Sequence, residues 1–93
     1  MSETFNGWTN YPTWAVNLCL TNDARTYKRW ITAAAAAETV AALADQIQEA
    51  LEDGTPEAVH GTVYADLLGH ALTLVNWYEI AEDFTRRAQE VRT

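Results

Sequence analysis

Apolar residues recur three and four positions apart through most of the chain, and this spacing constrains the fold more than any other feature. The two clearest sets are Tyr27, Trp30, Ile31 and Ala34, and then Val40, Leu43, Ala44, Ile47 and Leu51. Such spacing places the side chains on one face of a helix. No alternating run of useful length, which would indicate a half-buried strand, is present. The pattern therefore predicts an all-α fold.

Capping and stop signals divide the first half of the chain into three predicted helices. Asn10 is placed to cap the first helix, and Asn22 to cap a second helix over residues 23–37. The third helix is expected over 40–52, where Gly54 supplies a C-terminal stop.

The first of these helices is apolar nearly all round, which predicts that it is buried. Asn17 is the polar exception in its middle, and a buried amide without partners costs about 1–3 kcal/mol. We therefore expect Asn17 to bond a neighbouring helix or terminus.

Two further helices are predicted in the second half. Thr55-Pro56-Glu57 has the residue types that open a helix, and the apolar residues after Gly61 are dense enough to bury two of its sides. A last helix is expected to begin at Trp77. Asn76 would cap it, with Glu79 bonding back to the cap in a capping box.

The length of 93 residues supports one domain and excludes a second folding unit. We therefore expect residues 1–93 to form a single compact bundle of about five helices. Residues 1–9 are predicted to form an irregular arm without regular structure, which can tuck an aromatic side chain against the body.

The sequence predicts a reducing, cytoplasmic setting. The single cysteine, Cys19, cannot form an internal disulfide, and the first residues lack the basic and apolar regions of a secretory signal. No apolar run exceeds five residues, whereas a membrane span needs about 20. A membrane protein is therefore not expected.

Charge is unevenly placed along the chain. The net charge is −7, and nothing basic lies between Trp30 and Thr85. That stretch contains ten acids: Glu38, Asp45, Glu49, Glu52, Asp53, Glu57, Asp66, Glu79, Glu82 and Asp83. An ordinary solvated helix mixes charge signs at i,i+4 spacing, which stabilises it by a few tenths of a kcal/mol per pair. The absence of such pairing calls for an explanation.

No constellation of residues predicts catalysis, a metal or a cofactor. Cys19 lies on an apolar helix without a nearby histidine. Asp66 and His70 share a helical face, but a metal site needs three or four ligands, so a hydrogen-bonded pair is the better interpretation. Glu79, Glu82 and Asp83 are expected to face solvent, where nothing would raise their pKa for acid–base work. We therefore predict no catalytic, metal or cofactor site.

Direct nucleic-acid binding is not predicted either, because an acidic surface repels phosphates. The basic residues form two small clusters: Arg25, Lys28 and Arg29, and then Arg86, Arg87 and Arg92. They lack interleaved aromatics that could stack bases, because Tyr27 and Trp30 belong to the predicted core face. We expect the first cluster to pair with acids of adjacent helices.

The acidic residues admit two interpretations. One is a solubilising face. The other is a surface that imitates a phosphate backbone and binds a basic cleft of a nucleic-acid-handling protein. The residues predicted to bind such a partner are Asp45, Glu49, Glu52, Asp53 and Glu57, with Glu79, Glu82 and Asp83 as a second patch.

Two stretches of sequence carry a family resemblance. The first is Asn10-Tyr11-Pro12-Thr13-Trp14 with Leu18, Leu20, Asn22 and Asp23; the second is Tyr64-Ala65-Asp66-Leu67-Leu68, followed by Val75-Asn76-Trp77 and Ile80-Ala81-Glu82. The chain resembles a family of short acidic proteins encoded by bacteriophages, plasmids and other mobile elements. The family has no assigned activity, so the resemblance implies a bacterial setting and no functional residues.

Charge and resemblance together suggest an inhibitor of host nucleic-acid-directed defence, an anti-CRISPR or anti-restriction protein. This step rests on analogy. Its partner would be a CRISPR effector or restriction enzyme with a basic cleft. An alternative is a structural or regulatory protein that acts as a homodimer or through apolar contacts at Trp8, Tyr11 or Trp30. A third is an unrecognised hydrolase or metal protein around Asp66 and His70.

Overall fold

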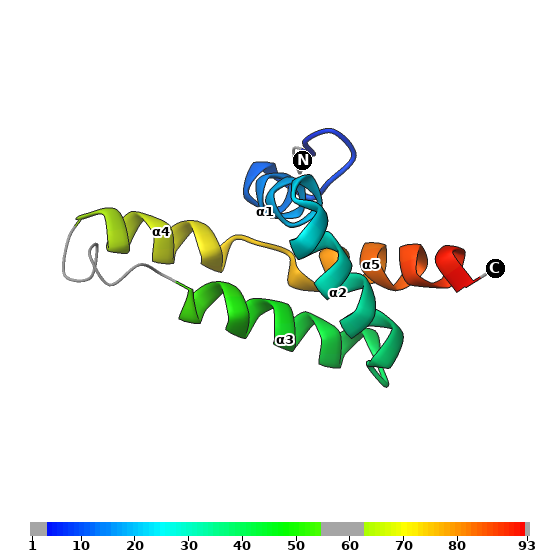
Figure 1. The fold of residues 1–93 in the computed structure, drawn as a ribbon. Coiled ribbons are helices and arrows are strands. Elements are labelled where there is room, and N and C mark those ends of the chain that lie inside the picture. The colour runs from blue at the N-terminus through cyan, green and yellow to red at the C-terminus, as the bar shows by residue number, and fades with distance from the viewer. Residues whose placement is uncertain (1–3, 55–62, 93) are drawn as a thin grey trace.

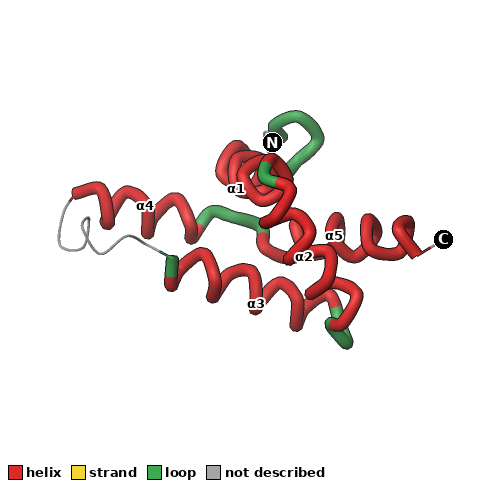
Figure 2. The backbone as a smooth tube through the Cα atoms, in the orientation of Figure 1, coloured by secondary structure: helices red, strands yellow, loops and turns green. Residues whose placement is uncertain are grey.

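Five α-helices make up the computed structural model, which describes residues 4–54 and 63–92 (Figure 1, Figure 2). They are α1 (Tyr11–Asn22), α2 (Ala24–Ala36), α3 (Val40–Asp53), α4 (Val63–Thr73) and α5 (Trp77–Arg92). The described ranges contain no β-sheet, so the predicted all-α class is confirmed. The predicted helix opening at Thr55-Pro56-Glu57 falls outside the described residues.

Side-chain caps fix where the helices begin. The Oδ1 atom of Asn10 accepts a hydrogen bond from Thr13 N at 3.0 Å, and Thr39 caps α3 in the same way. The prediction for α2 is wrong by one residue. Asp23 caps this helix, since it has an extended backbone and accepts from Arg25 N at 2.8 Å, while Asn22 is the last residue of α1.

Helix α5 is the centre of the arrangement, because α2 and α3 both pack extensively against it. Figure 1 shows α3 running antiparallel to α4 and α5, which follow each other roughly in line. Helix α1 packs mainly on α2.

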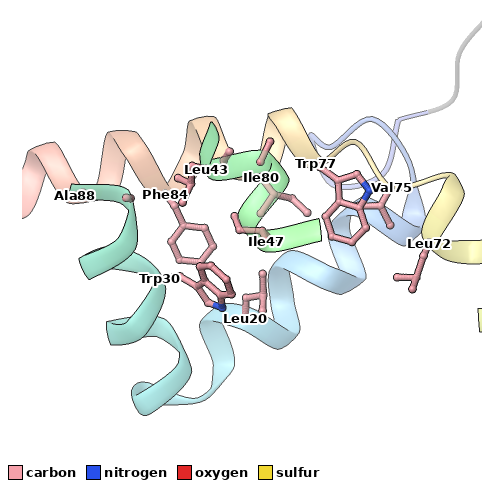
Figure 3. Close-up of a cluster of buried hydrophobic side chains, with 13 residues drawn as sticks. Leu20, Trp30, Leu43, Ile47, Leu72, Val75, Trp77, Ile80, Phe84 and Ala88 are labelled. Atoms are coloured by element: carbon pink, nitrogen blue, oxygen red, sulfur yellow. The ribbon is translucent and has the colours of Figure 1, made fainter. Parts of the chain in front are cut away.

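The core lies where α2, α3 and α5 meet. Leu43, Ile47, Ile80 and Phe84 are completely buried, and Trp30 packs beside them (Figure 3). The predicted apolar faces of α2, α3 and α5 therefore form this core, as their spacing indicated.

The prediction that α1 is buried all round is wrong. Only Thr13, Asn17 and Leu20 of this helix are buried, whereas Tyr11, Leu18 and Cys19 are exposed. Helix α1 packs through one side on α2 and α5, and Phe5 covers only part of its other side through ring contacts with Tyr11 and Trp14. The Nδ2 atom of Asn17 has no hydrogen-bond partner in the described protein, so the expected partner is also absent.

The prediction that α4 is buried on two sides is wrong as well. Val63 and Leu67 are each 62% exposed, and Leu74 just beyond the helix is 48% exposed. Leu72 is buried. Helix α4 makes few contacts with the other helices because it extends beyond the part of the molecule where they pack.

The N-terminal arm contains more structure than expected. Phe5 and Trp8 exchange two backbone hydrogen bonds of 2.8 Å around Asn6 and Gly7, whose φ angles are 48° and 88°. Positive φ at both central residues defines a tight hairpin turn, for which Asn-Gly is the strongest sequence signal. The expected tucking of an aromatic is confirmed, because Trp8 packs against the core. Phe5 lies 4.8 Å from Trp14 between ring centroids.

In the described ranges, no helix combines the length and the apolar character that crossing a bilayer requires.

Candidate acidic interface

The outer face of α3 carries a row of exposed carboxylates: Asp45, Glu49, Glu52 and Asp53. They lie opposite the buried Leu43 and Ile47 because they are offset from these residues by about half a helical turn. The amphipathic pattern that buries one side of α3 thus exposes its acids together. We call these four residues the α3 acidic face.

Most carboxylates of the α3 acidic face have no partner. Gln48 Nε2 donates to Glu52 Oε2 at 3.2 Å. The carboxylates of Asp45, Glu49 and Asp53 make no hydrogen bond or ion pair with the residues that the structure describes. These three charges are therefore available to a binding partner. Glu57, predicted to extend the face, lies outside the described residues.

The three residues of the second predicted patch all belong to α5 but lie in different environments. Glu82 is exposed. Glu79 is partly buried, and its Oε1 atom accepts from Thr9 N at 3.0 Å. It does not bond back to Asn76 N, which donates instead to Thr13 Oγ1 at 2.8 Å, so only the Asn76 half of the predicted capping box forms.

Asp83 is buried, and the prediction that it faces solvent is wrong. Only 6% of the residue is exposed. One carboxylate oxygen pairs with Arg86 Nη2, and the other accepts from Arg87 Nε at 2.7 Å. Arginines three and four positions after an acid lie on the same side of a helix, so the sequence spacing alone indicates these two ion pairs. Asp83 is consequently not an available carboxylate.

The ion pair with Asp83 also shifts the pKa of Arg87. Its pKa is raised, chiefly by the hydrogen bond to Asp83 and against the opposing effect of burial. Its guanidinium also lies 5.9 Å from the ring centroid of Tyr27. Two of the six basic side chains are thus committed to one buried acid.

A cavity of about 380 Å³ separates the N-terminal turn from α5. Its lining residues are Gly7, Trp8, Glu79, Glu82, Asp83 and Arg86. Trp8 offers an aromatic wall and Glu82 an exposed carboxylate, which suits the aliphatic stem and charged head of a lysine or arginine.

The basic cluster of Arg25, Lys28 and Arg29 does not pair with acids as expected. All three residues are exposed, and none makes an ion pair within residues 4–54 and 63–92. The guanidinium of Arg29 instead lies 5.2 Å from the ring centroid of Trp30. The cluster therefore does not neutralise Asp45, Glu49 or Asp53 of the α3 acidic face within the described residues.

Asp66 and His70 do not form the predicted hydrogen-bonded pair. Both are exposed on α4, and neither side chain bonds the other. Among the described residues, no three His, Cys, Asp or Glu side chains are grouped so that they could hold a metal ion.

The two stretches that carry the family resemblance meet at a hydrogen-bond network. The hydroxyl of Thr13 donates to Asn10 Oδ1 at 2.6 Å and accepts from Asn76 N at 2.8 Å. Asn10 Nδ2 donates to Leu74 O, and Asn76 Nδ2 donates to Thr9 Oγ1. The network joins the N-termini of α1 and α5, so these polar residues hold the fold together across more than 60 positions of sequence. Sequence reasoning identified the two caps but not the contact between them.

Comparison with known proteins gives one match. No curated protein and no solved structure matches the chain. A family model matches residues 1–91, which cover both helix caps and the acidic face. The chain therefore belongs to the family of unknown function DUF7249.

Proposed function

We propose that this protein is a non-enzymatic inhibitor of nucleic-acid-directed host defence. It binds the basic nucleic-acid cleft of a CRISPR effector or restriction enzyme through an acidic surface that imitates DNA. The observation that carries the proposal is the α3 acidic face, on which Asp45, Glu49 and Asp53 are exposed and unpaired within the described structure. The resemblance to acidic phage and plasmid proteins supplies the biological setting.

The spacing of these charges supports the imitation of a phosphate backbone. From residue 45 to residue 53 a helix rises about 12 Å, at about 1.5 Å per residue. Four carboxylates over that length place one charge about every 4 Å. A single DNA strand carries one phosphate per about 3.4 Å of helix axis. A basic cleft that fits a strand therefore meets a similar linear charge density on α3.

Folding does not account for the acidic face. Glu52 and Asp53 occupy the last turn of α3, where the helix dipole disfavours negative charge by about 0.3–1 kcal/mol. Asp45 and Glu49 are like charges at i,i+4 spacing, which destabilises a helix by about 0.2–0.5 kcal/mol. A row of acids that opposes the stability of its own helix is better explained by a binding role.

The second patch contributes Glu82, with Glu79 beside it and Trp8 as the aromatic wall of the cavity. A basic side chain of the partner would enter between them. Asp83 supports the patch by holding Arg86 and Arg87 and makes no direct contact in this scheme.

The test is displacement of a labelled DNA duplex from a purified CRISPR effector–guide complex and from a restriction enzyme. The variant D45N/E49Q removes two charges from the α3 acidic face. The control E38Q/E90Q removes two exposed charges elsewhere, so both variants have the same net charge. We expect D45N/E49Q to raise the half-inhibitory concentration about tenfold, since exposed ion pairs contribute up to about 1 kcal/mol each.

Inhibition by the native protein should also weaken steeply with salt, because exposed charges are screened over about 10 Å at 0.1 M. An equal loss of inhibition in D45N/E49Q and E38Q/E90Q would mean that only net charge matters. It would refute an interface on the α3 acidic face. Full inhibition by D45N/E49Q would refute the proposal outright.

A further inference from the structure

We propose that the apolar surface of α1 and α4 binds a second copy of this chain, with the two α4 helices packed antiparallel around a two-fold axis near residues 68–69. This interface is separate from the α3 acidic face. Of the three aromatic residues considered for an alternative dimer, it uses Tyr11 alone, because Trp30 is buried and Trp8 packs against the core.

Helix α4 presents an apolar stripe that no other helix covers. Val63 and Leu67 lie at i and i+4 on one side of the helix, and Leu74 follows just beyond its last residue, Thr73. They are 62%, 62% and 48% exposed. Single exposed apolar residues are ordinary, but a contiguous patch marks an interaction site.

Helix α1 extends the same surface. Tyr11 is 57% exposed and lines an apolar groove together with residues of α4. The groove has a volume of about 230 Å³, and its lining residues are Tyr11, Pro12, Ala15, Val16, Leu68, Ala71, Leu72 and Val75. An apolar cavity of about 150 Å³ accepts a benzene molecule. The groove therefore has room for a leucine side chain of a second molecule.

Charge identifies the occupant as a second copy. Helix α1 contains no charged residue, and α4 contains one acid, Asp66, and no lysine or arginine. Two molecules of net charge −7 repel one another least when they meet through this surface. A basic partner would be attracted instead to the α3 acidic face.

Asp66 and His70 make the α4 stripe complementary to itself. Both lie on the same flank of the stripe, and neither has a partner among residues 4–54 and the described side chains of 63–92. An antiparallel pair with its axis near residues 68–69 brings Val63 opposite Leu74 of the second copy. It also brings Asp66 within about one residue rise, 1.5 Å along the axis, of His70 of the second copy. The two-fold repeats this acid–histidine contact on the other side.

The experiment measures the mass of the full chain by light scattering across a concentration series. We expect a dimer of twice 10.4 kDa. Leu67→Glu should raise the dimer Kd more than about tenfold, because an exposed leucine on each chain loses its apolar contact. Thr32→Glu adds the same charge at an exposed position of α2 and should leave the dimer unchanged. Circular dichroism of each variant confirms that the fold is retained.

A charge exchange tests the antiparallel register. Asp66→Lys and His70→Glu should each weaken the dimer about threefold or more, since two symmetric contacts are lost. The double variant D66K/H70E places opposite charges across the two-fold and should recover most of the affinity. Recovery is not expected if the dimer uses any other surface.

Three results would overturn the proposal. One is a native chain that stays monomeric up to about 1 mM, where even a millimolar Kd would be visible. Another is a dimer that Leu67→Glu does not weaken. The third is a monomer whose apolar stripe binds phosphatidylcholine vesicles, which would assign the stripe to a lipid surface.

Discussion

At the scale of single residues, Asp83 shows how much a carboxylate depends on its surroundings. It is almost fully buried, and it bonds two arginines that are themselves 65% and 40% exposed in their side chains. In Asp83→Asn the amide keeps the size but loses the charge. We expect the free energy of unfolding to fall by about 1–2 kcal/mol, below the cost of breaking a wholly buried pair because solvent reaches both arginines.

Urea unfolding measures this effect, with Glu82→Gln as the neighbouring exposed control. The control should change stability by less than about 0.5 kcal/mol. If Asp83→Asn and Glu82→Gln had the same effect, the Asp83 ion pairs would contribute nothing to the fold.

Asn17 is the second residue whose behaviour depends on burial. Its Nδ2 atom is buried and has no protein partner in the described structure. Asn17→Leu keeps the branched shape and the number of heavy atoms and removes the unsatisfied amide, so we expect the free energy of unfolding to rise by about 1 kcal/mol. Thermal unfolding would show this as a higher Tm. A loss of stability would contradict the assignment and indicate that the amide has a partner.

At the scale of elements, the N-termini of α1 and α5 stabilise each other through Thr13. Its hydroxyl is completely buried between Asn10 and Asn76. Thr13→Val keeps the shape but leaves the Asn76 N–H without an acceptor, which should cost about 1–3 kcal/mol. Thr13→Ser keeps the hydroxyl and loses one methyl group.

Hydrogen exchange at the backbone amide of Asn76 distinguishes the loss of the hydrogen bond from the loss of side-chain packing. Protection should fall in Thr13→Val and persist in Thr13→Ser. Equal protection in both variants would show that the network does not couple the two helices.

The elements also show what could be predicted from sequence. Helix positions follow from apolar spacing and caps, which are local. The predicted start and end of α3 and the predicted start of α5 therefore agree with the structure to within a residue or two. The error at α2 arose because Asn22 and Asp23 are both good caps, and only backbone geometry distinguishes them.

Burial was harder to predict because it depends on what lies beside each helix. The apolar residues of α1 and α4 predict burial, yet neither helix is surrounded. The α3 acidic face was predictable, since the helix that exposes it has a clear apolar stripe. The Thr13–Asn76 contact was not predictable, because pairing across distant sequence is not encoded in local spacing. The Asp83 ion pairs are local, at i,i+3 and i,i+4, but the burial of Asp83 depends on the elements packed around it.

At the scale of the whole molecule, net charge opposes folding. Most acids in the described part of the chain have no basic partner there, and the whole chain carries −7. Self-repulsion of this kind destabilises a compact state, and salt screens it. The α3 acidic face should contribute much of this cost, because its charges repel one another and lie toward the unfavourable end of the helix dipole.

The variant D45N/E49Q/D53N should therefore be more stable than the native protein. Removing the like-charge repulsion and the unfavourable interaction with the helix dipole should raise the free energy of unfolding by about 1–2 kcal/mol at low salt. The gain should shrink as sodium chloride is raised, since screening already relieves the native chain. Urea unfolding at several salt concentrations measures both effects.

Glu38 provides a control outside the α3 acidic face. It lies between the C-terminal cap of α2 and the Thr39 cap of α3, where the dipoles of the two helices act in opposite directions, so Glu38→Gln should change stability by less than about 0.5 kcal/mol. A triple variant that is more stable but inhibits less would show that these carboxylates oppose folding and serve binding, a known trade-off at functional sites. A triple variant that is less stable would mean that the carboxylates support the fold, and the main reason for assigning them to a partner would be lost.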